Sequence, residues 1–157
     1  VLENSTQYEI RENEGRQKLQ ALISSRNDSI KVNFTTNQYA CFDASWTFKD
    51  ANNEDVNVIA EIKVRSKDFD SFIIEKSKLE RLQLEAKRMS KGGKKYLIYY
   101  INFCDNVAYF HNVTTLKYWF SGANISINRN TVRSLTDKAT KAVYFLPSNK
   151  AQKIEID

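Results

Sequence analysis

The sequence contains few of the residues that break, cross-link or anchor a chain. Among its 157 residues are one proline, four glycines and two cysteines. Scarce proline and glycine, together with 12% aromatic residues, exclude a disordered or low-complexity chain. No apolar run approaches the roughly 18–20 residues that span a bilayer. We therefore expect a folded protein that does not associate with a membrane.

Histidine and cysteine are too sparse for several kinds of site. Cys41 and Cys104 form no C-x-x-C pair and show no zinc-site spacing, so we expect two reduced thiols. His111 is the only histidine, which excludes a cluster of histidine ligands. Residues 1–10 lack the basic start and apolar core of a signal peptide. We expect a cytoplasmic protein, from a bacterium or a phage-infected host cell.

Positive charge is present but unevenly distributed. The net charge is +5, yet residues 1–60 carry 6 basic and 9 acidic side chains, whereas residues 61–95 carry 11 basic and 6 acidic. A basic zone of this kind suits a polyanion such as DNA. The alternative interpretation is a solvated, lysine-rich helix face. The length fits one domain, so residues 1–157 are predicted to form a single unit.

Hydrophobic periodicity predicts an α/β protein with a mixed central sheet flanked by helices. The second helix is expected to be capped by Asp70-Ser71 and stopped by Gly92-Gly93. Predicted helices cover residues 5–25, 72–90 and 114–120. Predicted strands cover residues 29–34, 39–48, 56–65, 95–104 and 106–112, with two more near 142–146 and 153–156.

Charged residues interrupt the predicted hairpin of residues 39–65. Strand alternation puts Glu61 and Lys63 on one face, opposite the apolar face that holds Ile62. Asp43 lies in the preceding strand, and hairpin pairing can bring it opposite them. Two carboxylates and one ammonium would then share one face of the sheet. The alternative is a half-exposed hairpin with a cross-strand Asp–Lys pair.

This grouping indicates a metal site. Two neighbouring carboxylates repel each other, and a divalent cation between them removes that conflict. Hard oxygen ligands in small number suit Mg²⁺, which keeps most of its waters and shares phosphate oxygens. The lysine can then position a water and offset charge on a phosphate undergoing attack.

Two segments together resemble the PD-(D/E)XK nuclease superfamily, which has the restriction-endonuclease-like fold. The segments are Phe42-Asp43-Ala44 and Glu61-Ile62-Lys63. Small phage and bacterial members read much like Glu61–Arg65, a short polar gap, and then Ile74–Leu79. The resemblance implies an αβββαβ core and covers about residues 5–113, leaving residues 114–157 as a C-terminal extension. Phe42 stands where the family pattern has proline.

The resemblance also implies roles for individual residues. Asp43 and Glu61 match the metal-binding carboxylates, and Lys63 matches the catalytic lysine. The backbone carbonyl of Ile62 matches a third metal oxygen. Many members add a glutamate from the first helix, for which Glu12 is the best match, and a basic or polar side chain from the second helix. For the latter we choose Lys78, with Lys76 as the second choice; a solvated helix lysine is the alternative.

The sequence therefore leads to two functional expectations. The first is a Mg²⁺-dependent deoxyribonuclease, with Mn²⁺ able to substitute, that hydrolyses phosphodiester bonds of DNA as an endonuclease. A homodimer would allow both strands to be cut. The second is a catalytically silent nuclease-fold module that binds nucleic acid or a protein partner. Arg129, Arg133, Lys138 and Lys141 are candidate phosphate contacts, or a solvated face.

Overall fold

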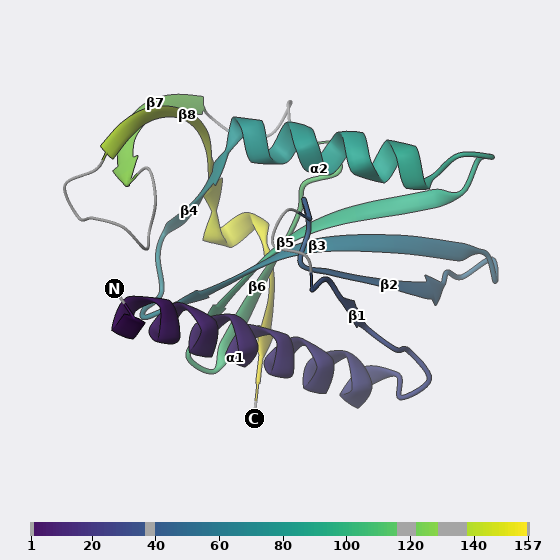
Figure 1. Ribbon diagram of the computed structural model, residues 1–157. Coiled ribbons are helices and arrows are strands. Elements are labelled where there is room, and N and C mark those ends of the chain that lie inside the picture. The colour runs from purple at the N-terminus through teal and green to yellow at the C-terminus, as the bar shows by residue number, and fades with distance from the viewer. Residues whose placement is uncertain (1, 37–39, 116–121, 129–137, 157) are drawn as a thin grey trace.

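The computed structural model describes residues 2–36, 40–115, 122–128 and 138–156 (Figure 1). These residues form a mixed α/β structure with a mixed central sheet, as predicted. The helices are α1 (Leu2–Arg26) and α2 (Lys76–Met89). The central sheet contains β1 (Asn33–Phe34), β2 (Ala44–Lys49), β3 (Asp55–Arg65), β5 (Lys95–Cys104), β6 (Val107–Asn112) and β9 (Gln152–Glu155). The second sheet contains β4 (Ser71–Glu75), β7 (Gly122–Asn128) and β8 (Lys138–Pro147).

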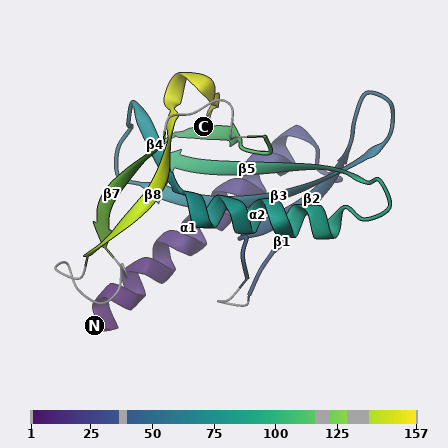
Figure 2. The same ribbon diagram turned by 90° about the horizontal axis from the view of Figure 1, so that it is seen from above.

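The central sheet has the order β1-β2-β3-β5-β6-β9 and is covered by one helix on each face (Figures 1 and 2). Its pairings are antiparallel except for β3 and β5, which run parallel. Parallel neighbours need a crossover connection, and here β4 and α2 supply it. Strand β3 therefore lies between β2, its antiparallel hairpin partner, and β5, its parallel partner.

Alternation along β3 divides the core into two layers, as the sequence predicted. Val58 and Ala60 pack with Leu19 on the α1 side of the sheet. Ile59 packs with Leu82 on the α2 side. Both layers are buried, so β3 is fixed from both faces and its register cannot slip without moving apolar side chains to the wrong layer.

Helix α1 approaches β3 closely at a glycine. A Cβ atom added to Gly15 would lie 2.9 Å from Cγ2 of Ile62 and 3.1 Å from Cγ2 of Val64. Both neighbours are β-branched side chains with few rotamers, so they have little freedom to move aside. Gly15 thus sets the distance between α1 and the strand that carries Glu61 and Lys63.

None of the helices that the structure describes combines the length and apolar character needed to cross a membrane.

The predicted start of the second helix is wrong. Ser71–Glu75 is a strand, α2 begins at Lys76, and Asp70-Ser71 caps nothing. The physical reason is pairing with β8, in which Phe72 lies opposite Leu146. The alternating burial of β4 has a period of two, and a strand partner far along the chain overrides the helical interpretation.

The first two strands are also shorter than predicted. β1 is limited to Asn33–Phe34, and β2 begins at Ala44, so Asp43 lies just before the strand rather than within it. The two predicted C-terminal strands are present as β8 and β9. Most of the predicted helix at 114–120, together with Arg129 and Arg133, lies outside the described residues.

The close approach at Gly15 makes a testable prediction. Gly15→Val should lower the free energy of unfolding by about 1–3 kcal/mol through overpacking against β3, although valine is preferred over glycine in helices. Denaturant unfolding measures the change. Gln17→Val, on the exposed side of the same helix, is the matched control and should change stability far less. Equal effects of the two substitutions would contradict this account of the α1–β3 contact.

Candidate active site

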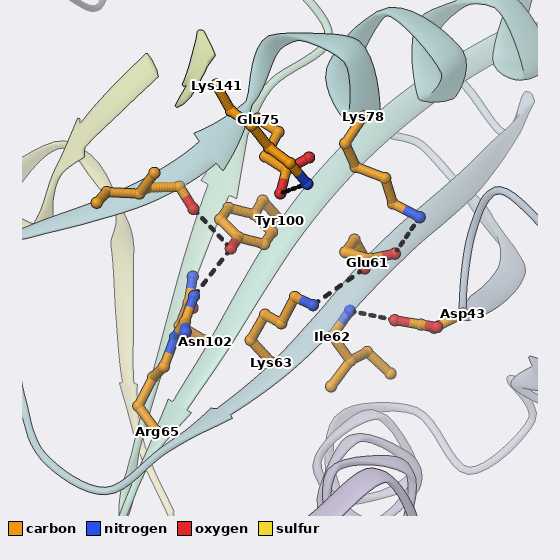
Figure 3. Close-up of polar contacts among 11 residues, drawn as sticks. Asp43, Glu61, Ile62, Lys63, Arg65, Glu75, Lys78, Tyr100, Asn102 and Lys141 are labelled. Atoms are coloured by element: carbon orange, nitrogen blue, oxygen red, sulfur yellow. Dashed lines mark hydrogen bonds and ion pairs between the residues drawn. The ribbon is translucent and has the colours of Figure 1, made fainter. Parts of the chain in front are cut away.

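The second half of β3 carries a row of polar side chains on its α2 face (Figure 3). Glu61, Lys63 and Arg65 each line two neighbouring pockets. The pocket toward α1 has a volume of about 230 Å³, and the pocket toward β4 and α2 has a volume of about 470 Å³. The row therefore forms the shared wall of a continuous polar depression.

Asp43 is fixed by backbone groups on both sides. Its N–H donates to the Ala60 carbonyl at 2.9 Å, and its own carbonyl accepts from the Thr35 N–H at 3.0 Å. Its carboxylate oxygen Oδ2 accepts from the Ile62 N–H at 2.8 Å. Because Ala44 pairs with Ala60, this arrangement sets Asp43 beside Glu61, the juxtaposition that the predicted hairpin required.

Glu61 is buried among charges. Its side chain is 8% exposed, with Oε1 at 3.6 Å from Nζ of Lys63 and Oε2 at 3.2 Å from Nζ of Lys78. The contact between the buried Oε2 and the ammonium of Lys78 is an ion pair. Burial and the nearby Asp43 charge raise the pKa of Glu61 to about 7, against the opposing effect of the two lysines.

The structure distinguishes the two lysines considered on the second helix. Lys78 extends from the first turn of α2 to the Glu61 carboxylate (Figure 3). Lys76 instead has its ammonium 4.9 Å from the centre of the Tyr144 ring. Lys141, a candidate phosphate contact, pairs with Glu75 at 3.1 Å at the edge of the second pocket. Lys78 is therefore the helix lysine that joins the carboxylates.

Glu12 does not join the other two carboxylates as a third member. It lines the first pocket, but its exposed side chain pairs with Arg16 at 2.9 Å. Within residues 2–36, 40–115, 122–128 and 138–156, no three His, Cys, Asp or Glu side chains are grouped so as to hold a metal ion. The residues brought together are thus two carboxylates and two lysines: Asp43, Glu61, Lys63 and Lys78.

Sequence reasoning missed the polar contacts of Arg65. Arg65 donates from Nε to Asn102 Oδ1 at 3.1 Å and from Nη2 to the Tyr100 hydroxyl at 3.0 Å. The Tyr100 hydroxyl donates in turn to the Ile73 carbonyl at 2.9 Å. One signal in the sequence could have revealed these contacts: Asn102 is a polar residue inside the almost wholly apolar strand β5. In the parallel register Asn102 lies opposite Lys63, within the part of the sheet that carries the charged side chains.

Comparison of the chain with protein-family models, with curated proteins and with solved structures found no match. The chemistry of the site therefore rests on its own residues. Paired carboxylates offer hard oxygen ligands, and the neighbouring ammonium groups offer charge to an anionic substrate. The arrangement suits chemistry on a phosphate group.

The raised pKa of Glu61 predicts that the free energy of unfolding depends on pH. The folded protein binds this proton more tightly than the unfolded chain does, so stability is lost as pH rises from about 4.5 to about 7. The loss should approach roughly 3 kcal/mol without divalent ions. Glu61→Gln should abolish most of it, as measured by unfolding at pH 5 and pH 8.

Glu80→Gln is the control for that measurement, because Glu80 is an exposed glutamate of α2. It should keep the pH dependence of the unaltered chain. If Glu61→Gln keeps that pH dependence as well, the conclusion that burial raises the pKa of Glu61 is wrong.

Proposed function

We propose that the chain is a metal-dependent deoxyribonuclease of the PD-(D/E)XK type, an endonuclease that hydrolyses phosphodiester bonds of DNA with Mg²⁺. One observation carries the proposal: Asp43 and Glu61 lie side by side at a polar pocket, with Lys63 on the same strand face. The order α1, β1, β2, β3, α2, β5 also agrees with the αβββαβ core that the resemblance implies, and β4 is an addition.

The residues present fit a divalent cation. Asp43 and Glu61 repel each other, and Glu61 is buried, so together they form a donor set that a cation would stabilise. Mg²⁺ binds through few carboxylates and keeps several waters, so a set of two is sufficient. Asp43, Glu61 and the carbonyl of Ile62 would hold it, and Mn²⁺ would substitute. Glu12 would have to leave Arg16 in order to contribute.

When bound, the cation would lower the pKa of a water nucleophile and offset charge on the scissile phosphate. Lys63 is 43% exposed, so its ammonium can orient the attacking water and stabilise the negative charge that develops on the phosphate. Lys78 holds the Glu61 carboxylate in place from the opposite side. The Ile62 N–H fixes one oxygen of Asp43 and leaves the other for a ligand.

The cationic lining of the two pockets supports a nucleic-acid substrate. The basic side chains come from α1, β3 and α2 and surround the carboxylates: Arg11, Arg16, Lys63, Arg65 and Lys78. Contacts of this kind with phosphates release counterions, so binding should weaken steeply with added salt. Cutting both strands of a duplex would require a second copy of the chain, as in a homodimer.

A second candidate function is a catalytically silent nuclease-fold module that binds nucleic acid or a protein. Two observations favour it. Glu61 already has an ammonium group near each carboxylate oxygen, and no third acidic ligand joins the pair among the described residues. Such a module would bind DNA without a requirement for divalent metal.

Cleavage tests the enzymatic proposal directly. Supercoiled plasmid should be nicked or cut with Mg²⁺ or Mn²⁺, and Lys63→Ala should slow this at least about 100-fold. Asp43→Asn should do the same, because the amide can still accept the Ile62 hydrogen bond but carries no charge for the cation. Lys49→Ala, which removes an exposed lysine paired with Asp55, is the control and should retain full activity. Cleavage that survives both site substitutions would refute the site assignment.

Metal-linked stability separates the two candidates without an activity assay. At Mg²⁺ about 100 times its Kd, the free energy of unfolding should rise by about 2–3 kcal/mol, because the cation binds only the folded chain. Thermal unfolding of Asp43→Asn should show no such rise. If the unaltered chain gains nothing from Mg²⁺ or Mn²⁺ yet binds DNA, the silent module is the correct function.

A further inference from the structure

We propose that Arg65 binds the phosphate next to the scissile phosphate on the same nucleic-acid strand, and that Asn102 and Tyr100 position its guanidinium for this purpose. The inference rests on the proposed function, since it needs a phosphodiester substrate in the polar depression. It adds to the proposed function the path of the substrate: the bound nucleic-acid strand would run along β3 from Glu61 toward Arg65.

The position of Arg65 gives the first support. It lies two residues beyond Lys63 on the same face of β3, and it lines both pockets that share the Glu61 carboxylate. Two residues of a β-strand advance about 6.6–6.8 Å. Successive phosphates of a nucleic-acid strand are separated by a distance of the same scale. A nucleic-acid strand that places one phosphate at Lys63 therefore brings its next phosphate to Arg65.

The geometry of the guanidinium gives the second support. Asn102 Oδ1 and the Tyr100 hydroxyl hold Nε and Nη2 at 3.1 and 3.0 Å, and Figure 3 shows the side chain turned toward them. An arginine has five N–H donors, so these two bonds leave three for a ligand. A guanidinium held in this way is ready for a bidentate contact with phosphate oxygens.

The charge of Arg65 is also left uncancelled. Other half-buried cations near the site pair with carboxylates: Arg16 with Glu12, Lys78 with Glu61, and Lys141 with Glu75. Both partners of Arg65 are neutral, and among the described residues no carboxylate forms a salt bridge with it. Neutral partners fix the orientation of the cation and leave its charge for an anion.

The burial of Asn102 points in the same direction. It is 0% exposed, and its Nδ2 donates no hydrogen bond to the described residues. A half-satisfied buried amide destabilises a fold, so packing alone favours an apolar residue there. A purely structural alternative is that Arg65 cross-links β3, β5 and β4. That alternative predicts a loss of stability without a specific loss of phosphate binding.

Binding of a fluorescein-labelled DNA duplex with single-stranded tails, measured by anisotropy without divalent ions, tests the inference. Arg65→Gln should raise Kd about 10-fold, as expected for one charge-assisted contact. It should also reduce the slope of log Kd against log salt by about 0.9, which a structural cross-link would not do. Arg65→Lys should keep the slope and bind more weakly than the unaltered chain. Arg26→Gln, at the far end of α1, is the control and should change neither quantity.

A phosphate scan on the unaltered protein keeps the test independent of how the variants fold. Single neutral methylphosphonate linkages are placed along one strand, and the linkage beside the position cut with Mg²⁺ should weaken binding. In Arg65→Gln, and in Asn102→Leu if it stays folded by thermal unfolding, that linkage should no longer matter. Asn102→Leu keeps the arginine charge, so losing the effect there identifies positioning rather than charge.

The outcomes separate the two levels of proposal. If the unaltered chain binds and cuts DNA but no neutral linkage beside the cut weakens binding, the Arg65 inference is overturned and the nuclease proposal stands. An unchanged salt slope in a folded Arg65→Gln variant overturns it in the same way. If the unaltered chain neither binds nor cuts DNA, the nuclease proposal fails and the inference fails with it.

Discussion

The hydrogen bond from the Ile62 N–H to the Asp43 carboxylate is the interaction on which the site depends. The pairing of β2 with β3 stops at Ala44 and Ala60, so the Ile62 N–H, two residues further along β3, needs an acceptor that β2 does not supply. The Asp43 side chain provides it. One carboxylate oxygen thereby completes the edge of a sheet, and the other takes no part in that hydrogen bond. Structure and the proposed chemistry thus use different atoms of one residue.

Opposing electrostatic effects meet at Glu61. Burial and Asp43 disfavour its charge, whereas Lys63 and Lys78 favour it, and the first pair of effects is the larger. A side chain selected only for stability would be apolar here, because a buried ion pair seldom repays its desolvation. The core on both faces of β3 provides the stability that tolerates this cost. An unfavourable charge within a rigid framework is a common property of functional sites.

Sequence patterns predicted what depends on local periodicity. β3 and β5 appear at their expected positions, and alternation alone placed Glu61 and Lys63 together. The start of α2 was mispredicted because β4 owes its form to β8, a partner that no local pattern reveals. The contacts of Arg65 were missed because Asn102 belongs to another strand, and only the parallel register brings them together.

The junction between β4 and α2 has a mechanical consequence. Glu75 is both the last residue of β4 and the N-terminal flanking residue of α2, so no linker separates the second sheet from the helix that carries Lys78. A displacement of β4 would therefore also displace the first turn of α2, which carries Lys78. β8, in the C-terminal part of the chain, pairs with β4 and so contributes to fixing the position of the Lys78 charge beside Glu61.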